Sequence, residues 1–223
     1  MSTKVGIIAE GPIDHALLPA LLSRIVMMKV GIKWPIRGED IAELFQIRKR
    51  GHGAVVEVVR RLVEALDTEF FDHHCFVILL DRLTRSVQEE VRTLISTRNR
   101  FILGVAIEEI EAWWLGDRTN TLNWADLRIN LPLGCRFAAK KYKAEADDNP
   151  KLTLDELTRF SERLDSFYGV GNVDLAREFA EDYWKNFASL GEISAQCPEG
   201  YKPFERAVIN AFRPLKKASK HRK

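Results

Sequence analysis

Short apolar runs alternate with amphipathic stretches through the first half of the chain. The mostly apolar runs, each bounded by polar residues, are residues 4–9, 76–80 and 101–107. Runs of this kind are typical of strands that are buried on both faces of a sheet. Apolar residues recur at helical spacing in residues 13–29, 54–66 and 86–97. The alternation predicts an α/β fold with a mostly parallel sheet flanked by helices.

Two segments of this half are less regular. Pro19 lies inside the first amphipathic stretch, so we expect a kinked or split helix there. In residues 32–50 we expect short strands at 34–36 and 45–47 around a turn near Gly38.

The pattern of the second half predicts a helical extension. We expect helices at 108–116, 153–164, 173–189 and 201–213, separated by Gly, Asn, Pro and Asp residues. The predicted organisation is therefore an α/β domain over residues 1–115, a helical extension over 116–212, and a basic tail over 213–223. We expect the tail to be disordered.

Composition and charge narrow the class of protein. The chain has 223 residues, with 34 Lys and Arg against 32 Asp and Glu, and a net charge of +2. The last eleven residues hold six Lys and Arg and no acid, which leaves −4 on residues 1–212. This balance disfavours a protein that coats nucleic acid over its whole surface. We expect no membrane segment, because the apolar runs are short, and three widely spaced cysteines favour the reducing cytoplasm.

Acidic residues follow each of the three predicted strands. Glu10 and Asp14 follow the first, Asp81 ends the second, and Glu108, Glu109 and Glu111 follow the third. The carboxyl ends of parallel strands meet at one edge of the sheet, where sites form. Clustered carboxylates repel one another unless a cation neutralises them, and a hard ion such as Mg²⁺ or Mn²⁺ suits oxygen ligands. The alternative is that each acid caps a helix.

These motifs resemble a known family. Glu10-Gly11-Pro12 with Asp14, after an apolar strand, resembles the first motif of the Toprim (topoisomerase–primase) fold. Residues 79–83 resemble its Asp-x-Asp motif, and residues 107–117 resemble the Glu-x-Trp-Leu signature of RloB-like and related bacterial Toprim proteins. Further matches to the same group are Asn149-Pro150-Lys151, Tyr168, Cys197-Pro198 and Phe204.

The resemblance implies a Toprim-like sheet and a metal-dependent nuclease that acts on DNA or RNA with one or two Mg²⁺ or Mn²⁺ ions. It also implies an ABC-type ATPase partner and a role in bacterial phage defence. By position, Glu10 would be the acid/base or metal-ligand glutamate, Asp81 a metal ligand and Glu111 the signature acid. Glu109 would be its neighbour and Asp14 an additional ligand.

One position departs from the family pattern. The second aspartate of Asp-x-Asp is Leu83 here, and Arg82 and Arg85 flank the motif. A lost ligand and added positive charge both weaken a cation site. Three explanations stay open: residues 108–111 supply the missing ligand, a single ion binds, or the chain is a non-catalytic subunit that binds and regulates an ATPase.

Two basic segments are candidates for contact with nucleic acid. Arg48, Lys49 and Arg50 precede two glycines that allow close approach of a phosphate to the backbone. Lys140, Lys141 and Lys143 alternate with aromatic residues, as in strips that combine stacking with phosphate neutralisation. The alternatives are a solvated turn and an ordinary surface helix.

Overall fold

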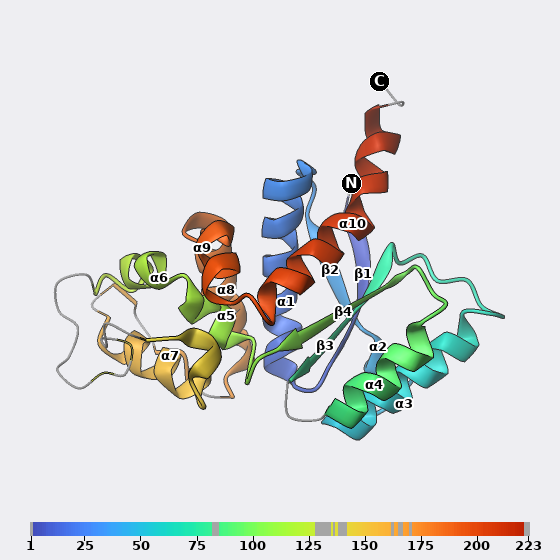
Figure 1. Cartoon of the computed structure of the whole chain (residues 1–223), viewed down its shortest axis with the longest axis horizontal. Coiled ribbons are helices and arrows are strands. Elements are labelled where there is room, and N and C mark those ends of the chain that lie inside the picture. Colours follow the sequence, from blue (N-terminus) through green and yellow to red (C-terminus); the bar gives the residue numbers. More distant parts are fainter. Residues whose placement is uncertain are drawn as a thin grey trace.

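The computed structural model describes residues 2–81, 85–127, 135, 137, 142–161, 163–164, 167–169 and 171–220, with only the backbone of 217–220. The described residues form one sheet of four parallel strands (Figure 1). The strands are β1 (Thr3–Ala9), β2 (Ile36–Asp40), β3 (Cys75–Asp81) and β4 (Phe101–Ala106). The predicted α/β class and parallel sheet are thereby confirmed, and the architecture is consistent with a Toprim-like fold followed by C-terminal helices.

The strand order is β2-β1-β3-β4, so the two strands that carry the first two acidic motifs are central neighbours. Ala9 pairs with Leu79, and Asp81 pairs with Ala106. Because all four strands run in the same direction, the segments after β1, β3 and β4 leave the sheet at one edge.

Helices connect and cover the strands. In the first half they are α1 (Pro12–Ile25), the π-helix η1 (Val26–Val30), α2 (Ile41–Leu44), α3 (His52–Ala65) and α4 (Arg85–Ile95). In the second half they are α5 (Glu111–Gly116), α6 (Arg118–Trp124), the 3₁₀ turn η3 (Ala144–Ala146), α7 (Pro150–Arg159), α8 (Val173–Asn186), α9 (Leu190–Gln196) and α10 (Tyr201–Lys220).

The two faces of the sheet have separate cores, because successive side chains of a strand point to opposite faces. On β3, Val77 and Leu79 join the core that includes α1, α8 and α10. Phe76 and Ile78 join the core of α3 and α4 on the other face. In Figure 1, α3 and α4 lie together on one side of the sheet.

The helical extension shares its core with the first of these faces. Trp114 is fully buried and packs against Trp124 and Tyr183, with ring centroids 5.0 and 4.6 Å apart. Trp113 stacks on Phe204 of α10 at 5.1 Å. These side chains belong to the same cluster of buried residues as β1 and α1. The tandem tryptophans therefore join the extension to the α/β part by packing.

Several local expectations differ from the structure. Helix α1 continues through Pro19 instead of splitting, and a π-helical turn follows its end. Gly38 lies within β2, not in a turn, and a Cβ there would lie 2.4 Å from Ile7 Cδ1. Glycine therefore allows close packing on that strand. Residues 45–47 form no strand; Gln46 adopts a left-handed φ of 57° in the turn after α2.

The basic C-terminal segment also differs from our expectation. Helix α10 passes Arg213 and Pro214 and ends at Lys220, so residues 213–220 are helical where we expected disorder. Within the part of the chain that the structure describes, no helix is both long and apolar enough to cross a membrane.

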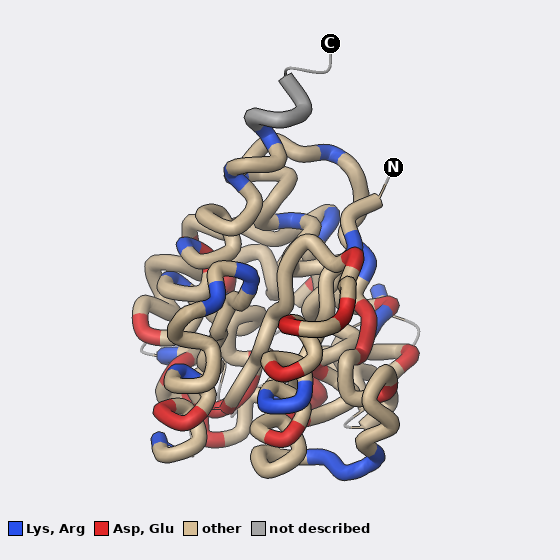
Figure 2. The backbone as a smooth tube through the Cα atoms, turned by 90° about the vertical axis from the view of Figure 1, so that its right-hand side faces the viewer, with Lys and Arg blue, Asp and Glu red and all other residues tan. Residues whose placement is uncertain are grey.

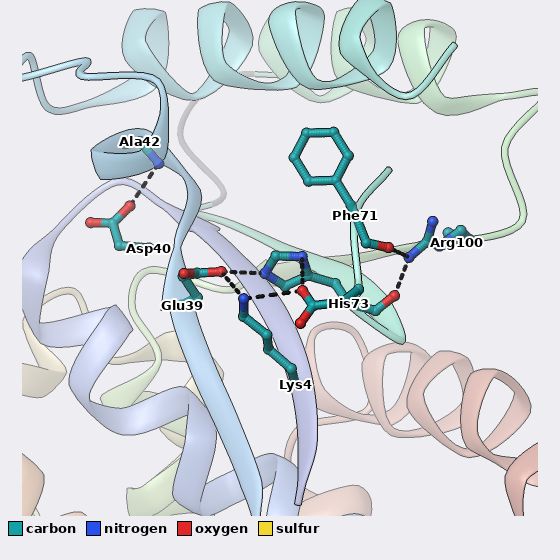
Figure 3. A network of polar contacts seen from close by, with 8 residues as sticks. Lys4, Glu39, Asp40, Ala42, Phe71, His73 and Arg100 are labelled. Atoms are coloured by element: carbon teal, nitrogen blue, oxygen red, sulfur yellow. Dashed lines mark hydrogen bonds and ion pairs between the residues drawn. The ribbon is translucent and has the colours of Figure 1, made fainter. Parts of the chain in front are cut away.

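A network of polar contacts fastens the loop before β3 to the sheet (Figure 3). Lys4 Nζ lies 2.9 Å from Glu39 Oε2 and 3.1 Å from Asp72 Oδ1, and His73 Nε2 lies 2.5 Å from the same glutamate oxygen. Arg100 donates to the carbonyl oxygens of Phe71 and His73. Burial lowers the pKa of His73 below its ordinary value, partly offset by Glu39. This network holds β1, β2 and the entrance to β3 in register.

Candidate active site

The acidic residues predicted to meet at one edge of the sheet do act on one another in the folded chain. Glu10 follows β1, Asp81 ends β3, and Glu109 and Glu111 follow β4. The charges of Glu10, Glu109 and Asp14 each raise the pKa of Asp81. The same electrostatic coupling links Glu111 to Asp14 and Glu109. The parallel topology therefore brings all five sequence-predicted acids into one site, which we call the acidic cluster.

Both carboxylate oxygens of Glu10 have a close polar neighbour. Its Oε1 accepts a hydrogen bond of 3.0 Å from the backbone N–H of Asp81. Its Oε2 lies 2.6 Å from His52 Nδ1 at the start of α3, and only 12% of its side chain is exposed. Gly51 N–H also donates to the Glu10 carbonyl oxygen at 3.2 Å. Glu10 thus joins the ends of β1 and β3 to the first turn of α3.

Asp14 is buried at the start of α1. Its Oδ2 accepts a hydrogen bond of 3.1 Å from Gly11 N–H, so the helix-capping interpretation of this residue is correct. Burial raises its pKa to about 6, with Glu10 and Glu109 adding to the rise and Lys151 and Gly11 opposing it. Asp14 therefore both caps the helix and contributes charge to the cluster.

Asp81 and Glu111 are the most perturbed acids of the cluster. Burial, followed by the charges of Asp14 and Glu10, raises the pKa of Asp81 to about 8. Burial raises the pKa of Glu111 to about 7. Glu111 is fully buried; its Oε1 accepts a hydrogen bond of 2.6 Å from Tyr168 OH, and its Oε2 has no hydrogen-bond partner among the described residues. A buried carboxylate oxygen without a partner is costly unless a proton or a cation satisfies it.

Lys151 supplies a positive charge within this cluster. Its Nζ lies 2.8 Å from Glu109 Oε1, and its backbone N–H donates to Glu109 Oε2 at 3.3 Å. Burial opposes its charged form, but Glu111, Glu109 and Asp14 outweigh burial and raise its pKa. The Asn149 side chain caps α7, and Pro150 occupies its first turn, so Lys151 is placed at a well-defined helix start.

Lys151 is the residue of this site that local sequence patterns do not predict. Asn149-Pro150-Lys151 belongs to the motifs of the family resemblance, which assigns the lysine no role. Its partner Glu109 lies 42 residues earlier in the chain. No periodicity or spacing indicates a contact over that separation.

Glu108 marks local backbone strain beside the cluster. It adopts a left-handed φ of 63°, which a residue with a side chain adopts at some cost. Strained residues of this kind concentrate at functional sites, where the surrounding structure holds them in place. Here the unusual backbone redirects the chain from β4 toward Glu109 and Glu111.

The two basic segments differ in how they are connected to the acidic cluster. Arg48, Lys49 and Arg50 are exposed and lead directly into Gly51 and His52, which contact Glu10. Arg50 also pairs with Asp40 at 3.2 Å. In the second segment, Lys143 is exposed before η3, whereas Lys140 and Lys141 lie outside the described residues, as do Arg82 and Leu83.

The donor chemistry of the cluster fits a hard divalent cation, because it is made of carboxylates and one buried oxygen lacks a partner. The side chains of the cluster are farther apart than the ligands of one ion. No three described His, Cys, Asp or Glu side chains are grouped closely enough to hold one ion together. Binding an ion therefore requires the carboxylates to close in, with Lys151 either retained as a second positive charge or displaced.

Fold and site together define an α/β protein with a lysine-containing carboxylate cluster at the carboxyl edge of a parallel sheet. No family model matches the chain, and no curated protein or solved structure matches it either.

Proposed function

We propose that this protein is a divalent-metal-dependent phosphodiesterase that cleaves DNA or RNA at the acidic cluster, in the cytoplasm. The observation that carries the proposal is the convergence of five acids from three strand ends around one lysine. Pushing the pKa values of Asp14, Asp81 and Glu111 upward costs stability, and proteins keep such clusters mainly where the charge is used.

Each residue has a role under this proposal. Asp81, Glu109 and Glu111 would hold one Mg²⁺ or Mn²⁺ ion, with Asp14 adding negative charge from the helix start. The bound ion would polarise the phosphate and assist the attack of water. Glu10, oriented by Asp81 N–H and His52, would move a proton at the attacking or leaving oxygen.

The positive charge of Lys151 favours a site with one divalent ion over a site with two. Its ammonium already neutralises part of the cluster, which otherwise contains only acids. Since Leu83 replaces a carboxylate in the family pattern, one divalent ion together with the fixed charge of Lys151 provides charge balance with fewer ligands. The ammonium would then stabilise negative charge on the phosphate.

A cleavage assay tests the proposal. End-labelled single- and double-stranded DNA and RNA would be incubated with the parent chain, E10Q and D81N, each in Mg²⁺, in Mn²⁺ and in EDTA. We expect cleavage that EDTA abolishes and that each substitution lowers by at least about 100-fold. E178Q, which changes an exposed glutamate of α8, is the matched control and should cleave like the parent. Equal cleavage by E10Q, D81N and parent would refute the proposal.

The second candidate function is a non-catalytic subunit that binds and regulates an ABC-type ATPase, and one observation favours it. Lys151 already pairs with the Glu109 carboxylate in a cluster where no three described ligand-type side chains are closely grouped. This function predicts no metal-dependent cleavage of any substrate, stable co-purification with an ATPase encoded beside the chain, and altered ATP turnover in that complex. Calorimetric Mg²⁺ binding that D81N abolishes would count against it. A role in phage defence is a proposal common to both functions.

A further inference from the structure

A pocket lined by cations lies between the end of η1 and the C-terminal half of α10. Its lining consists of Lys29 and Val30 from the η1 side and Asn210, Arg213, Pro214 and Lys216 from α10, around about 400 Å³. Three of these six residues are cationic, one carries an amide, and none is acidic. Lys29 Nζ forms an ion pair with Glu205 Oε1 at 3.2 Å.

The two sides of the pocket are held together by close packing. A Cβ at Gly31, which has a left-handed φ of 80°, would lie 3.4 Å from Lys216 Nζ. The ammonium of Lys216 therefore lies against the backbone at the end of η1. Phe212, the residue before Arg213, is fully buried and fixes α10 at this level. The backbone that carries these cations is therefore fixed by packing, although their side chains are exposed.

The basic pocket is at the opposite end of the sheet from the acidic cluster. His74, directly before β3, contacts the Ala211 carbonyl oxygen through Nε2 at 2.9 Å, and its ring lies 4.7 Å from that of Phe212. This contact places Arg213 and the residues after it beside the amino end of β3, whereas Asp81 lies at its carboxyl end. The six rises of about 3.3 Å along the seven residues of β3 place the ends of this strand about 20 Å apart.

The figures agree with this placement. In Figure 1 the last turns of α10 project beyond the sheet beside the N-terminus. In Figure 2 the positions nearest the two termini carry Lys and Arg, whereas most Asp and Glu positions lie toward the other end. The end of the molecule near the two termini is therefore basic, whereas the other end carries residues of both signs.

The pocket presents its cations from both sides. Arg213 and Lys216 are three residues apart, so they share one face of α10, and Lys29 lies on the η1 side. Three residues of helix rise about 5 Å, which is comparable to the spacing of about 3.4 Å between phosphates of one strand. Three cations placed in this way match a chain of phosphates better than a single anion.

We infer that the η1/α10 pocket binds the phosphodiester backbone of a nucleic acid, as a second contact about 20 Å from the acidic cluster. The inference rests on the pocket and helix alone and does not require catalysis at the cluster. Because the contacts are to phosphates, the pocket would bind without sequence preference, and the affinity would fall steeply with salt.

The test measures fluorescence anisotropy of labelled 20-nucleotide single strands of DNA and RNA between 50 and 200 mM salt, with EDTA present. The pocket variant is K29Q/R213Q/K216Q. The control variant R60Q/R61Q/R177Q removes three exposed cations from α3 and α8, with the same change in net charge. Each lost phosphate contact lowers the slope of log affinity against log salt by about 0.7. We expect the pocket variant to lose about 2 from this slope and at least about tenfold in affinity, and the control variant to resemble the parent.

Two further arms make the result decisive. R213K/K216R keeps the charges, so it should bind like the parent; unfolding midpoints checked beforehand ensure that all variants are folded. The assay contains EDTA and measures binding alone, so failure of the catalytic proposal leaves this inference intact. Equal losses in the pocket and control variants would overturn it. A second result would also overturn it: the parent binds inorganic phosphate saturably, and the pocket variant loses this binding but keeps oligonucleotide binding. The pocket would then bind a small phosphate.

Discussion

Replacing Glu111 by Gln should change how the stability of the protein depends on pH. The substitution keeps the shape of the side chain and an acceptor oxygen for Tyr168 OH, but removes the carboxyl group that burial holds at a pKa of about 7. The folded chain then binds one proton fewer between the ordinary pKa of a glutamate and pH 7. Stability should therefore become less sensitive to pH in that interval.

The size and sign of the effect come from proton linkage. In the parent, folding raises the pKa of Glu111 from 4.5 to about 7. The folded chain therefore binds this proton more tightly than the unfolded chain does, and the resulting stabilisation is complete below pH 4.5. That contribution is lost as pH rises toward 7. At about 1.4 kcal/mol per pH unit, the loss amounts to about 3 kcal/mol. E111Q lacks this loss, so its free energy of unfolding relative to the parent should increase by about 3 kcal/mol between pH 4.5 and pH 8.

Urea unfolding at pH 4.5, 6, 7 and 8 in EDTA measures this difference directly. E178Q on the surface of α8 should follow the parent at every pH. Adding Mg²⁺ at pH 8 should then stabilise E111Q less than the parent, because E111Q lacks one of the three carboxylates proposed to hold the ion. Parallel stability curves for E111Q and parent across this pH range would refute the assignment of a buried, raised-pKa carboxyl group to Glu111.

Two further substitutions probe the cluster and the packing beneath it. K151M should destabilise the chain by about 2 kcal/mol at pH 8 in urea unfolding, because Glu109 loses a partly buried partner. This free energy lies between the values typical of exposed and of buried ion pairs. K185M on α8 is its control, and an equal loss in both would contradict the role of Lys151. G104A should cost about 1–3 kcal/mol, because its Cβ would lie 2.7 Å from Phe204 Cδ2. Unchanged thermal unfolding of G104A, with G53A as control at an open position, would show that β4 and α10 do not pack this closely.

Much of the α/β half could be predicted from local pattern. The apolar runs that became β1, β3 and β4 are too short and too uniformly apolar for surface helices, and the intervening helical periodicities identified α3 and α4 within a few residues. β2 was harder to place, because it is a short strand whose pattern is mostly polar, and its pairing with β1 decides its conformation. Likewise, packing against β2 and α8 holds α1 together across Pro19, which local propensity predicts to be a break.

The acidic cluster shows the same division between local pattern and long-range contact. The chain itself determines that Glu10, Asp81 and Glu111 follow strands, because strand ends are readable from apolar runs, and parallel pairing then carries them to one edge. Only the tertiary structure decides that Lys151 enters from α7, that Tyr168 donates to Glu111, and that α10 takes its basic face to the far end of the sheet. These contacts join residues 42 to 137 positions apart, and their energy comes from burial and charge that exist only once the cores have packed.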